Sequence, residues 1–324
     1  MKKEILIERF PENPILTPAD VGWVRKNYPK KDWGVLNCGV IFDKKDSHYK
    51  MLFRAGAGAF ADIGLAVSED GVNWQAKEKP VLKHSDNNFW YCRRGIEDPR
   101  IVKWIDGYYY VFATACSEPD PVTKVTGRIG IWRTRNFLDF EWIAVAFEWE
   151  DKNASIFPEP INGWAYLIHR KFPHMWISRT RDLTLRSGWQ DTQVLIEKDR
   201  FYRSPTTGNL PHKIGLAGPP IKTPKGWLVV THVVHGKGEN RFNRVYSLGF
   251  MVLDLQNPTK IKDVHPAPIL WPTEKYEMMG CVPVVCFSGA TVDLGGDALY
   301  IYYAGADTVI CGGRLYKKDL PMCY

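Results

Sequence analysis

The chain has 324 residues, of which 45% are hydrophobic, 24% charged and 13% aromatic. This composition supplies enough apolar material for a folded core and excludes an intrinsically disordered chain. Its 43 Lys and Arg residues exceed the 36 Asp and Glu residues, but they are dispersed along the chain, which argues against a nucleic-acid-binding surface.

Five units of similar outline follow one another along the chain. Each has two apolar or aromatic strands separated by a polar turn. The expected pairs are 39–43 and 49–54, 100–104 and 108–113, 158–161 and 164–170, 219–222 and 227–232, and 290–293 and 299–303. Asp106-Gly107 and Asn162-Gly163 are strong hairpin signals, because both turn residues must adopt positive φ. Most units continue into a third strand, expected at 63–68, 129–134, 176–180 and 246–251.

The repeat of β-units predicts an all-β chain folded as a five-bladed β-propeller, with a β-sandwich as the alternative. We expect one catalytic domain over residues 1–324, in which about the first 30 residues close the ring or cover one face. In such a fold the innermost strand of each blade directs side chains toward one central pocket.

Charged and polar residues in or beside the expected inner strands are therefore the candidates for a site, because a buried charge costs free energy unless it is paired. They are Asn37, Arg54, Glu97, Asp98, Arg100, Arg170, Lys222, His232 and Asp307. The densest group lies at residues 93–100, where Glu97 and Asp98 stand between arginines. For any one of these residues, an ion pair between blades is an equally simple interpretation.

At this group the chain resembles glycoside hydrolase family 130. The resemblance is carried by Glu-Asp-Pro-Arg at 97–100, Asp-Lys-Asn-Ala-Ser-Ile-Phe-Pro at 151–158, Leu-Ile-His-Arg at 167–170, Gly-Pro-Pro-Ile-Lys-Thr at 218–223 and Tyr-Ala-Gly-Ala-Asp at 303–307. It implies a five-bladed propeller that cleaves β-mannosidic bonds, in most members by inverting phosphorolysis. Inorganic phosphate would attack the anomeric carbon and yield α-mannose 1-phosphate and a shortened sugar, in a reversible reaction.

The resemblance assigns the single catalytic acid to Asp98, acting through the mannosyl 3-hydroxyl. Because phosphate is already an ionised nucleophile, a phosphorylase needs no second carboxylate to activate water, whereas an inverting hydrolase needs two carboxyl groups roughly 6.5–9.5 Å apart. A phosphorylase instead needs cations that hold the phosphate, and arginine suits a phosphate through paired hydrogen bonds.

The resemblance also implies the roles of the other candidates. The expected phosphate-binding residues are Lys152, Arg170, Lys222, His232 and Asn37. The expected substrate-binding residues are Arg54, Glu97 and Asp307, among which Glu97 would face away from Asp98 and pair with Arg94 or Arg100. Lys152 stands where relatives often have arginine, so it keeps the charge but loses the forked geometry.

Two rival functions remain open at this point. A β-mannoside hydrolase on the same fold would need a carboxylate that activates water, for which Glu159 is the candidate. A non-catalytic sugar-binding propeller would tolerate the loss of Asp98. The linkage, β-1,2 or β-1,4, and the acceptor sugar are likewise open.

We expect no resident cofactor or metal, with inorganic phosphate as co-substrate and a mannoside oligosaccharide as the other partner. His232 and His235 are separated by an odd offset, which places their rings on opposite faces of a strand. Seven cysteines without a Cys-x-x-Cys pair indicate reduced thiols. With no membrane-length or signal-like apolar run, we expect a cytoplasmic protein with neither membrane nor nucleic-acid partners, and homo-oligomer formation stays open.

Overall fold

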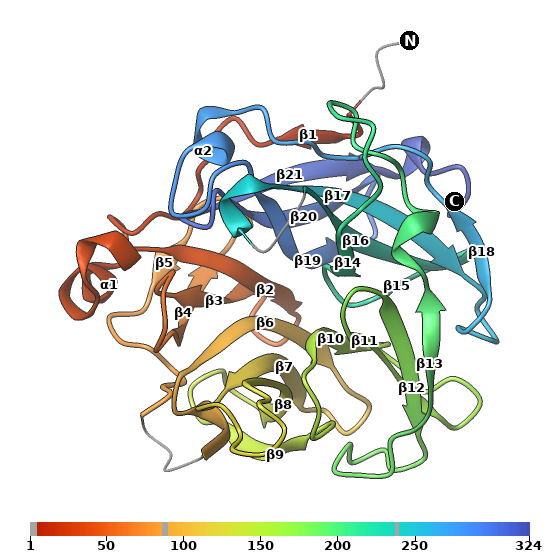
Figure 1. Cartoon of the computed structure of the whole chain (residues 1–324), viewed down its shortest axis with the longest axis horizontal. Helices are drawn as coiled ribbons and strands as arrows, with labels where there is room; N and C mark the ends of the chain where they lie inside the picture. Colours follow the sequence, from red (N-terminus) through yellow and green to blue (C-terminus); the bar gives the residue numbers. More distant parts are fainter. Residues whose placement is uncertain (1–4, 86–89, 237–239) are drawn as a thin grey trace.

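Strands dominate the computed structural model, which describes residues 5–85, 90–236 and 240–324. They form five sheets set around a common axis, with one edge strand of each sheet nearest the centre (Figure 1). This arrangement confirms the predicted five-bladed β-propeller.

Each blade is an antiparallel sheet, and the first three are built in chain order from the centre outward. Blade 1 comprises β2 (Val35–Asp43), β3 (His48–Ala55), β4 (Asp62–Ser68) and β5 (Gln75–Ala76). Blade 2 comprises β6 (Gly95–Lys103), β7 (Tyr109–Cys116), β8 (Gly127–Thr134) and β9 (Glu141–Val145). Blade 3 comprises β10 (Lys152–Ile156), β11 (Ala165–Arg170), β12 (Met175–Thr180) and β13 (Gln190–Ile196).

The remaining two blades each depart from simple chain order. Blade 4 comprises β14 (Lys213–Leu216), β16 (Gly226–Gly236), β17 (Arg244–Leu253) and β18 (Ile261–Val264), with β15 (Ile221–Thr223) paired to β16. Blade 5 comprises β19 (Cys286–Asp293), β20 (Ala298–Gly305), β21 (Val309–Tyr316) and β1 (Ile7–Arg9). The short helices are α1 (Gly22–Asn27), α2 (Lys275–Met278) and the 3₁₀ turns η1 (Lys30–Asp32), η2 (Trp90–Cys92), η3 (Lys198–Arg200), η4 (Arg241–Asn243) and η5 (Lys317–Asp319).

The N-terminal strand β1 completes the last blade. It pairs antiparallel with β21, with Ile7 opposite Leu315, and Leu16 then forms an isolated bridge with Ile310. The segment between these two contacts and β2 carries α1, whose Trp23 and Val24 are buried. Residues 1–4 of the expected closing segment lie outside the described residues. Joining the first and last strands in one sheet ties the two ends of the chain together.

The predicted strand pairs are confirmed in blades 1, 2 and 5. In blade 4 the expected segments also pair, as β15 with β16, but in blades 3 and 4 the expected first segment is not the innermost strand. The innermost strands there are β10 and β14, which precede the expected segments 158–161 and 219–222. Both expected segments are rich in proline, which lacks the amide hydrogen that an inner strand donates. Ile161 makes only an isolated bridge with Trp164, and β15 pairs with the end of β16 beyond β14.

Apolar side chains fill the space between neighbouring blades. Between blades 2 and 3, for example, Tyr110 and Ile131 pack in one buried cluster with Ala165 and Leu167. Burial of such area is the main favourable term in folding. The blades therefore hold one another in fixed positions around the axis. No helix in the described ranges is long and apolar enough to cross a membrane.

Backbone contacts and one arginine bring the inner strands of neighbouring blades close together. A Cβ on Gly39 would lie 2.7 Å from the Pro99 carbonyl oxygen, and one on Gly289 would lie 2.6 Å from that of Cys38, so the inner strands of three blades nearly touch. Arg100, 1% exposed, reaches from β6 to β14 and donates hydrogen bonds to the carbonyls of Ala217 (2.7 Å) and Leu216 (2.8 Å). The two ends of the ring, where the inner strands begin and where they end, are called its two mouths below.

Candidate active site

The inner strands carry polar side chains at one mouth, where each strand begins. The pairing register slips at this height in β2, β6 and β10. At these bulges Asn37, Asp98 and Asn153 adopt φ of 46°, 56° and 53°. Asn and Asp tolerate this left-handed conformation better than most residues, and such strain is commonly found at functional sites. The same local irregularity thus presents one short polar side chain from each of three blades.

Asp98 lies at the centre of the carboxylate half of this site. Its Oδ1 accepts a hydrogen bond from Asn37 Nδ2 at 2.8 Å and lies 3.5 Å from Arg54 Nη1. Burial lowers the pKa of Arg54, but the charges of Glu97, Asp98 and Asp307 outweigh burial and hold that pKa above its ordinary value. The structure therefore brings Asn37, Arg54, Asp98 and Asp307 together, as predicted from the sequence.

Glu97 has different partners from those expected. It does not pair with Arg94 or Arg100: its Oε1 lies 3.1 Å from Arg54 Nη2, and its Oε2 lies 3.7 Å from Lys152 Nζ. The bulge between Glu97 and Arg100 breaks the strict alternation of side chains, so both adjacent carboxylates reach Arg54. Arg94 instead approaches Glu118 at 3.4 Å. Glu97 consequently links the carboxylate half of the site to its cationic half.

The cationic half is built on blades 3 and 4. Lys152 and Arg170 stand opposite each other in the β10–β11 pair. Lys213 begins β14, and its pKa is lowered to about 6 by burial and by the charges of Arg170, Arg244 and Lys152, with Asp307 opposing. Burial also lowers the pKa of Arg170. So many cations at close range repel one another, and an anion bound among them would relieve that repulsion.

His232 lies beneath these cations. It is fully buried, and neither of its ring nitrogens has a hydrogen-bond partner among the residues that the structure describes. Burial, with the charges of Arg170, Arg100 and Lys213, lowers its pKa well below the ordinary value, so the ring is neutral. A Cβ on Gly215 would lie 2.4 Å from His232 Nε2, which shows that the ring covers this glycine. A buried polar group without a partner is costly and points to a ligand.

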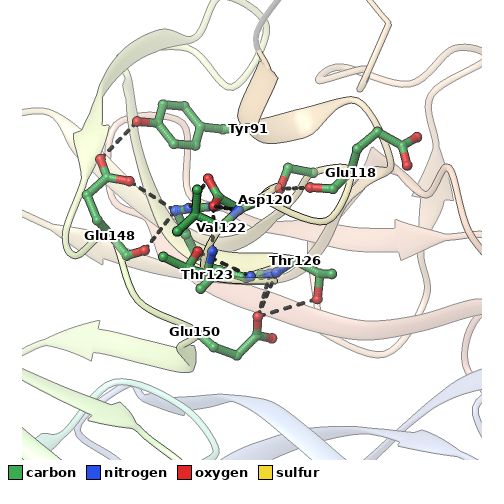
Figure 2. Close-up of polar contacts among 12 residues, drawn as sticks. Tyr91, Glu118, Asp120, Val122, Thr123, Thr126, Glu148 and Glu150 are labelled. Atoms are coloured by element: carbon green, nitrogen blue, oxygen red, sulfur yellow. Dashed lines mark hydrogen bonds and ion pairs between the residues drawn. The ribbon is translucent and has the colours of Figure 1, made fainter.

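Glu148 and Glu150, in the connection between blades 2 and 3, hold together a wall of polar contacts (Figure 2). Glu150 Oε2 accepts hydrogen bonds from the amides of Thr126 (2.8 Å) and Gly127 (2.9 Å), and Glu148 accepts one from Tyr91 (2.9 Å). A Cβ on Gly127 would lie 3.0 Å from Lys152 Cε, so this wall packs directly on the lysine stem. Glu148 and Glu150 are therefore engaged in hydrogen bonds that hold neighbouring segments of the chain in place.

A cavity of about 460 Å³ adjoins the cationic half. Its walls include Lys152, Arg170 and Lys171, together with the rings of Trp149 and Phe172. The two rings are 37% and 63% exposed, respectively. Aromatic faces beside charged groups suit a ligand that carries both apolar sugar faces and an anion.

Lys222 does not belong to this site, contrary to the prediction. It lies at the opposite mouth, in a cavity of about 710 Å³ lined by the far ends of β2, β6 and β19, and its Nζ lies 2.5 Å from Glu159 Oε1. The cause is the corrected blade-4 topology, because Lys222 belongs to β15 and not to the innermost strand. Glu159, the candidate for activating water in a hydrolase, is therefore also remote from Asp98.

Sequence reasoning missed Lys213, Arg244 and Tyr246. Burial raises the pKa of Tyr246, with Asp307 adding to the shift and Arg170 and Arg244 opposing it, so the phenol lies between the two halves of the site. Lys213 is not among the predicted candidates because the inner strand of blade 4 is expected at 219–222. Its position, the first residue of an apolar Lys-Ile-Gly-Leu strand, was the available signal.

Comparison with known proteins identifies the family of the chain. The family model described as β-1,4-mannooligosaccharide phosphorylase matches residues 6–320. The chain belongs to glycoside hydrolase family 130. Within family 130 it is similar to 1,2-β-oligomannan phosphorylase of Thermoanaerobacter sp. (strain X514), at 34% identity over 98% of this chain and 99% of the relative.

Two further similarities extend over most of the chain. A β-1,2-mannobiose phosphorylase of the same Thermoanaerobacter strain is 32% identical, with 97% of this chain and 98% of the relative covered. The solved structure of β-1,2-mannobiose phosphorylase from Listeria innocua, in complex with β-1,2-mannobiose, matches with a TM-score of 0.79 at 26% identity. That match covers 98% of this chain and 99% of the other.

Proposed function

We propose that this family 130 protein is an inverting phosphorylase of β-1,2-linked mannooligosaccharides, acting in the cytoplasm. The β-mannoside phosphorylase activity rests on full-length similarity to named phosphorylases. The choice of the β-1,2 linkage is supported by the names of the two Thermoanaerobacter relatives, at 34% and 32% identity, while relatives named for 1,4- or 4-O-β-mannosyl bonds are less similar, at 26–27%. The seven free cysteines support a reducing compartment.

One observation carries the reaction type. Asp98 faces a cluster of cations and an unpartnered neutral histidine, and the carboxylate proposed for water activation, Glu159, lies at the opposite mouth. A hydrolase needs a second carboxylate to activate water. A phosphorylase needs an anion site instead, and Lys152, Arg170, Lys213 and His232 form one.

The proposed reaction is a single displacement. Protonated Asp98 donates its proton, through the mannosyl 3-hydroxyl, to the departing glycosidic oxygen while the bond from C1 to that oxygen breaks. A phosphate oxygen forms the new bond to C1 from the opposite face, which inverts the configuration. The proton carried by hydrogen phosphate restores Asp98, so no other reactant is consumed. Asn37, through its hydrogen bond, and Arg54 position the acid.

The remaining residues bind the two substrates. Lys152, Arg170, Lys213 and His232 hold the phosphate, and Glu97 orients Lys152 through their ion pair. We assign Asp307 and Arg54 to the mannosyl unit. The reaction uses phosphate as co-substrate and requires no resident cofactor.

Incubation with β-1,2- and β-1,4-mannooligosaccharides, with and without inorganic phosphate, tests this function by ³¹P and ¹H NMR. We expect α-mannose 1-phosphate to form only with phosphate and with the β-1,2 substrate. Asp98→Asn keeps the size of the side chain and removes the acid, so turnover should fall by roughly 10²–10⁴-fold. Free mannose released equally without phosphate would refute the phosphorylase and identify a hydrolase.

A further inference from the structure

A chain of four polar side chains, three of them buried, runs behind the cationic half of the site. His169 Nδ1 lies 2.6 Å from Asp151 Oδ2, and His169 Nε2 lies 3.0 Å from Ser178 Oγ. Ser178 Oγ in turn lies 2.8 Å from Thr192 Oγ1. Asp151, His169 and Ser178 are at most 1% exposed, and the reaction described above uses none of them. Buried charge retained at this cost calls for a physical explanation.

The position of the chain relates it to two phosphate-binding cations. Asp151 directly precedes Lys152, and His169 directly precedes Arg170. Lys152 and Arg170 are cross-strand partners, and the Asp151–His169 contact joins the residues that directly precede them, Asp151 just before β10 and His169 within β11. Because successive residues of a strand face opposite sides, His169 lies on the face opposite Arg170. The contact therefore fixes the backbone from which both cations project.

The hydrogen bonds form a consistent directional sequence. Where His169 Nδ1–H donates to Asp151, His169 Nε2 accepts from Ser178, and Ser178 Oγ accepts from Thr192. Asp151 also accepts hydrogen bonds from the Lys152 amide (2.8 Å) and from Trp149 Nε1 (3.3 Å). Every polar atom of the imidazole is satisfied, so its orientation is fixed.

Packing and charge add to this constraint. The Phe147 ring lies 4.8 Å from the His169 ring, between centroids, and helps to bury it. Burial lowers the pKa of Arg170, while Tyr246 and Asp151 are among the groups that oppose this shift. The carboxylate thus supports the charged form of Arg170 without occupying the anion site itself.

We propose that Asp151 and His169 are positioning residues that hold Lys152 and Arg170 in the geometry that binds phosphate. This inference rests on the proposed function, because it takes the bound anion to be inorganic phosphate. If the pair positions these cations, its loss weakens phosphate binding selectively. A general contribution to folding would instead lower stability and affect both substrates alike.

Steady-state kinetics of variants test the proposal. His169→Phe keeps an aromatic ring beside Phe147 but removes both hydrogen bonds, and His169→Asn retains an N–H near the Nδ1 position. We expect His169→Phe and Asp151→Asn to raise KM for phosphate at least tenfold, with KM for the mannooligosaccharide changed less than twofold. His169→Asn should recover at least half of the lost affinity on a logarithmic scale.

A matched control separates positioning from stability. Tyr109 donates a buried 2.6 Å hydrogen bond to Asp43, near the opposite mouth, so Tyr109→Phe removes a similar bond remote from the cations. We expect Tyr109→Phe to lower the unfolding temperature and leave both KM values within twofold. Direct titration with inorganic phosphate should reproduce the order of affinities. If His169→Phe does not fold, the two KM values of Asp151→Asn are compared with those of Tyr109→Phe, and the same criteria apply.

The proposal is refuted if KM for phosphate stays within twofold in the folded variants, or if both KM values rise in proportion. The proposed function is tested separately by the wild-type protein. If wild-type turnover does not depend on phosphate, the function is wrong, whereas a phosphate-dependent wild type with unaffected variants overturns only the positioning role.

Discussion

Lys213 offers a quantitative test of the cationic half of the site. Its pKa is lowered to about 6 by burial and by Arg170, Arg244 and Lys152, with Asp307 opposing. In the phosphate-free protein, about one-tenth of the molecules would carry a charged Lys213 at pH 7 and about one-hundredth at pH 8. Because phosphate binding requires the charged form, the apparent affinity is reduced by that fraction. KM for phosphate should therefore rise about tenfold for each pH unit above 7.

The assay is the pH dependence of phosphorolysis between pH 6.5 and 8.5, with two Lys213 variants. Lys213→Arg carries a permanent charge, so its KM for phosphate should lack this dependence and stay low. Lys213→Met should also lack it, with a high KM throughout. The ionisation of phosphate itself affects all three proteins equally, and His232 is already neutral in this range. The ratio of KM for phosphate between the wild type and each variant therefore isolates the effect of Lys213 ionisation.

The stability of the phosphate-free protein provides an independent check on the direction of the Lys213 pKa shift. Between pH 6 and about 10, the unfolded chain binds a proton at Lys213 that the folded chain does not. The free energy of unfolding must then increase with pH in this window, relative to Lys213→Met. Identical pH profiles of KM in the wild type and Lys213→Arg would refute the reasoning, since Lys213 would then be charged throughout.

Three other substitutions test the remaining geometry. Lys222→Ala should leave KM for phosphate within twofold, because Lys222 lies at the opposite mouth with Glu159; a tenfold increase in steady-state assays would contradict that placement. Gly215→Ala places a Cβ 2.4 Å from His232 Nε2, so we expect phosphorolysis to fall at least tenfold, and full activity would show that the ring need not occupy its present position. Arg100→Met leaves three buried carbonyls without their donor, which should cost about 3 kcal/mol or more of the free energy of unfolding in denaturant titration; a loss below about 1 kcal/mol would argue against its bridging role.

The sequence alone determined the blade count and much of the carboxylate half of the site. Turn signals such as Asp106-Gly107 act over a few residues, so hairpins can be located without knowledge of the rest of the chain. Asp98 and Arg54 could be singled out because a charge in an apolar strand needs an explanation wherever the strand lies. Their joint identity as a mannoside site came from the family resemblance of several motifs.

Tertiary structure decided which of these side chains meet. Lys222 and Lys213 are both lysines of blade 4, and only strand order separates them, with Lys213 on the innermost strand and Lys222 on β15 at the far mouth. The Glu97 bulge redirected a carboxylate that strict alternation places elsewhere. Arg100 links two blades by donating hydrogen bonds to carbonyls 116 and 117 residues away along the chain. Contacts at such separation, and the pKa shifts they cause, depend on where whole blades pack, and no local pattern encodes that.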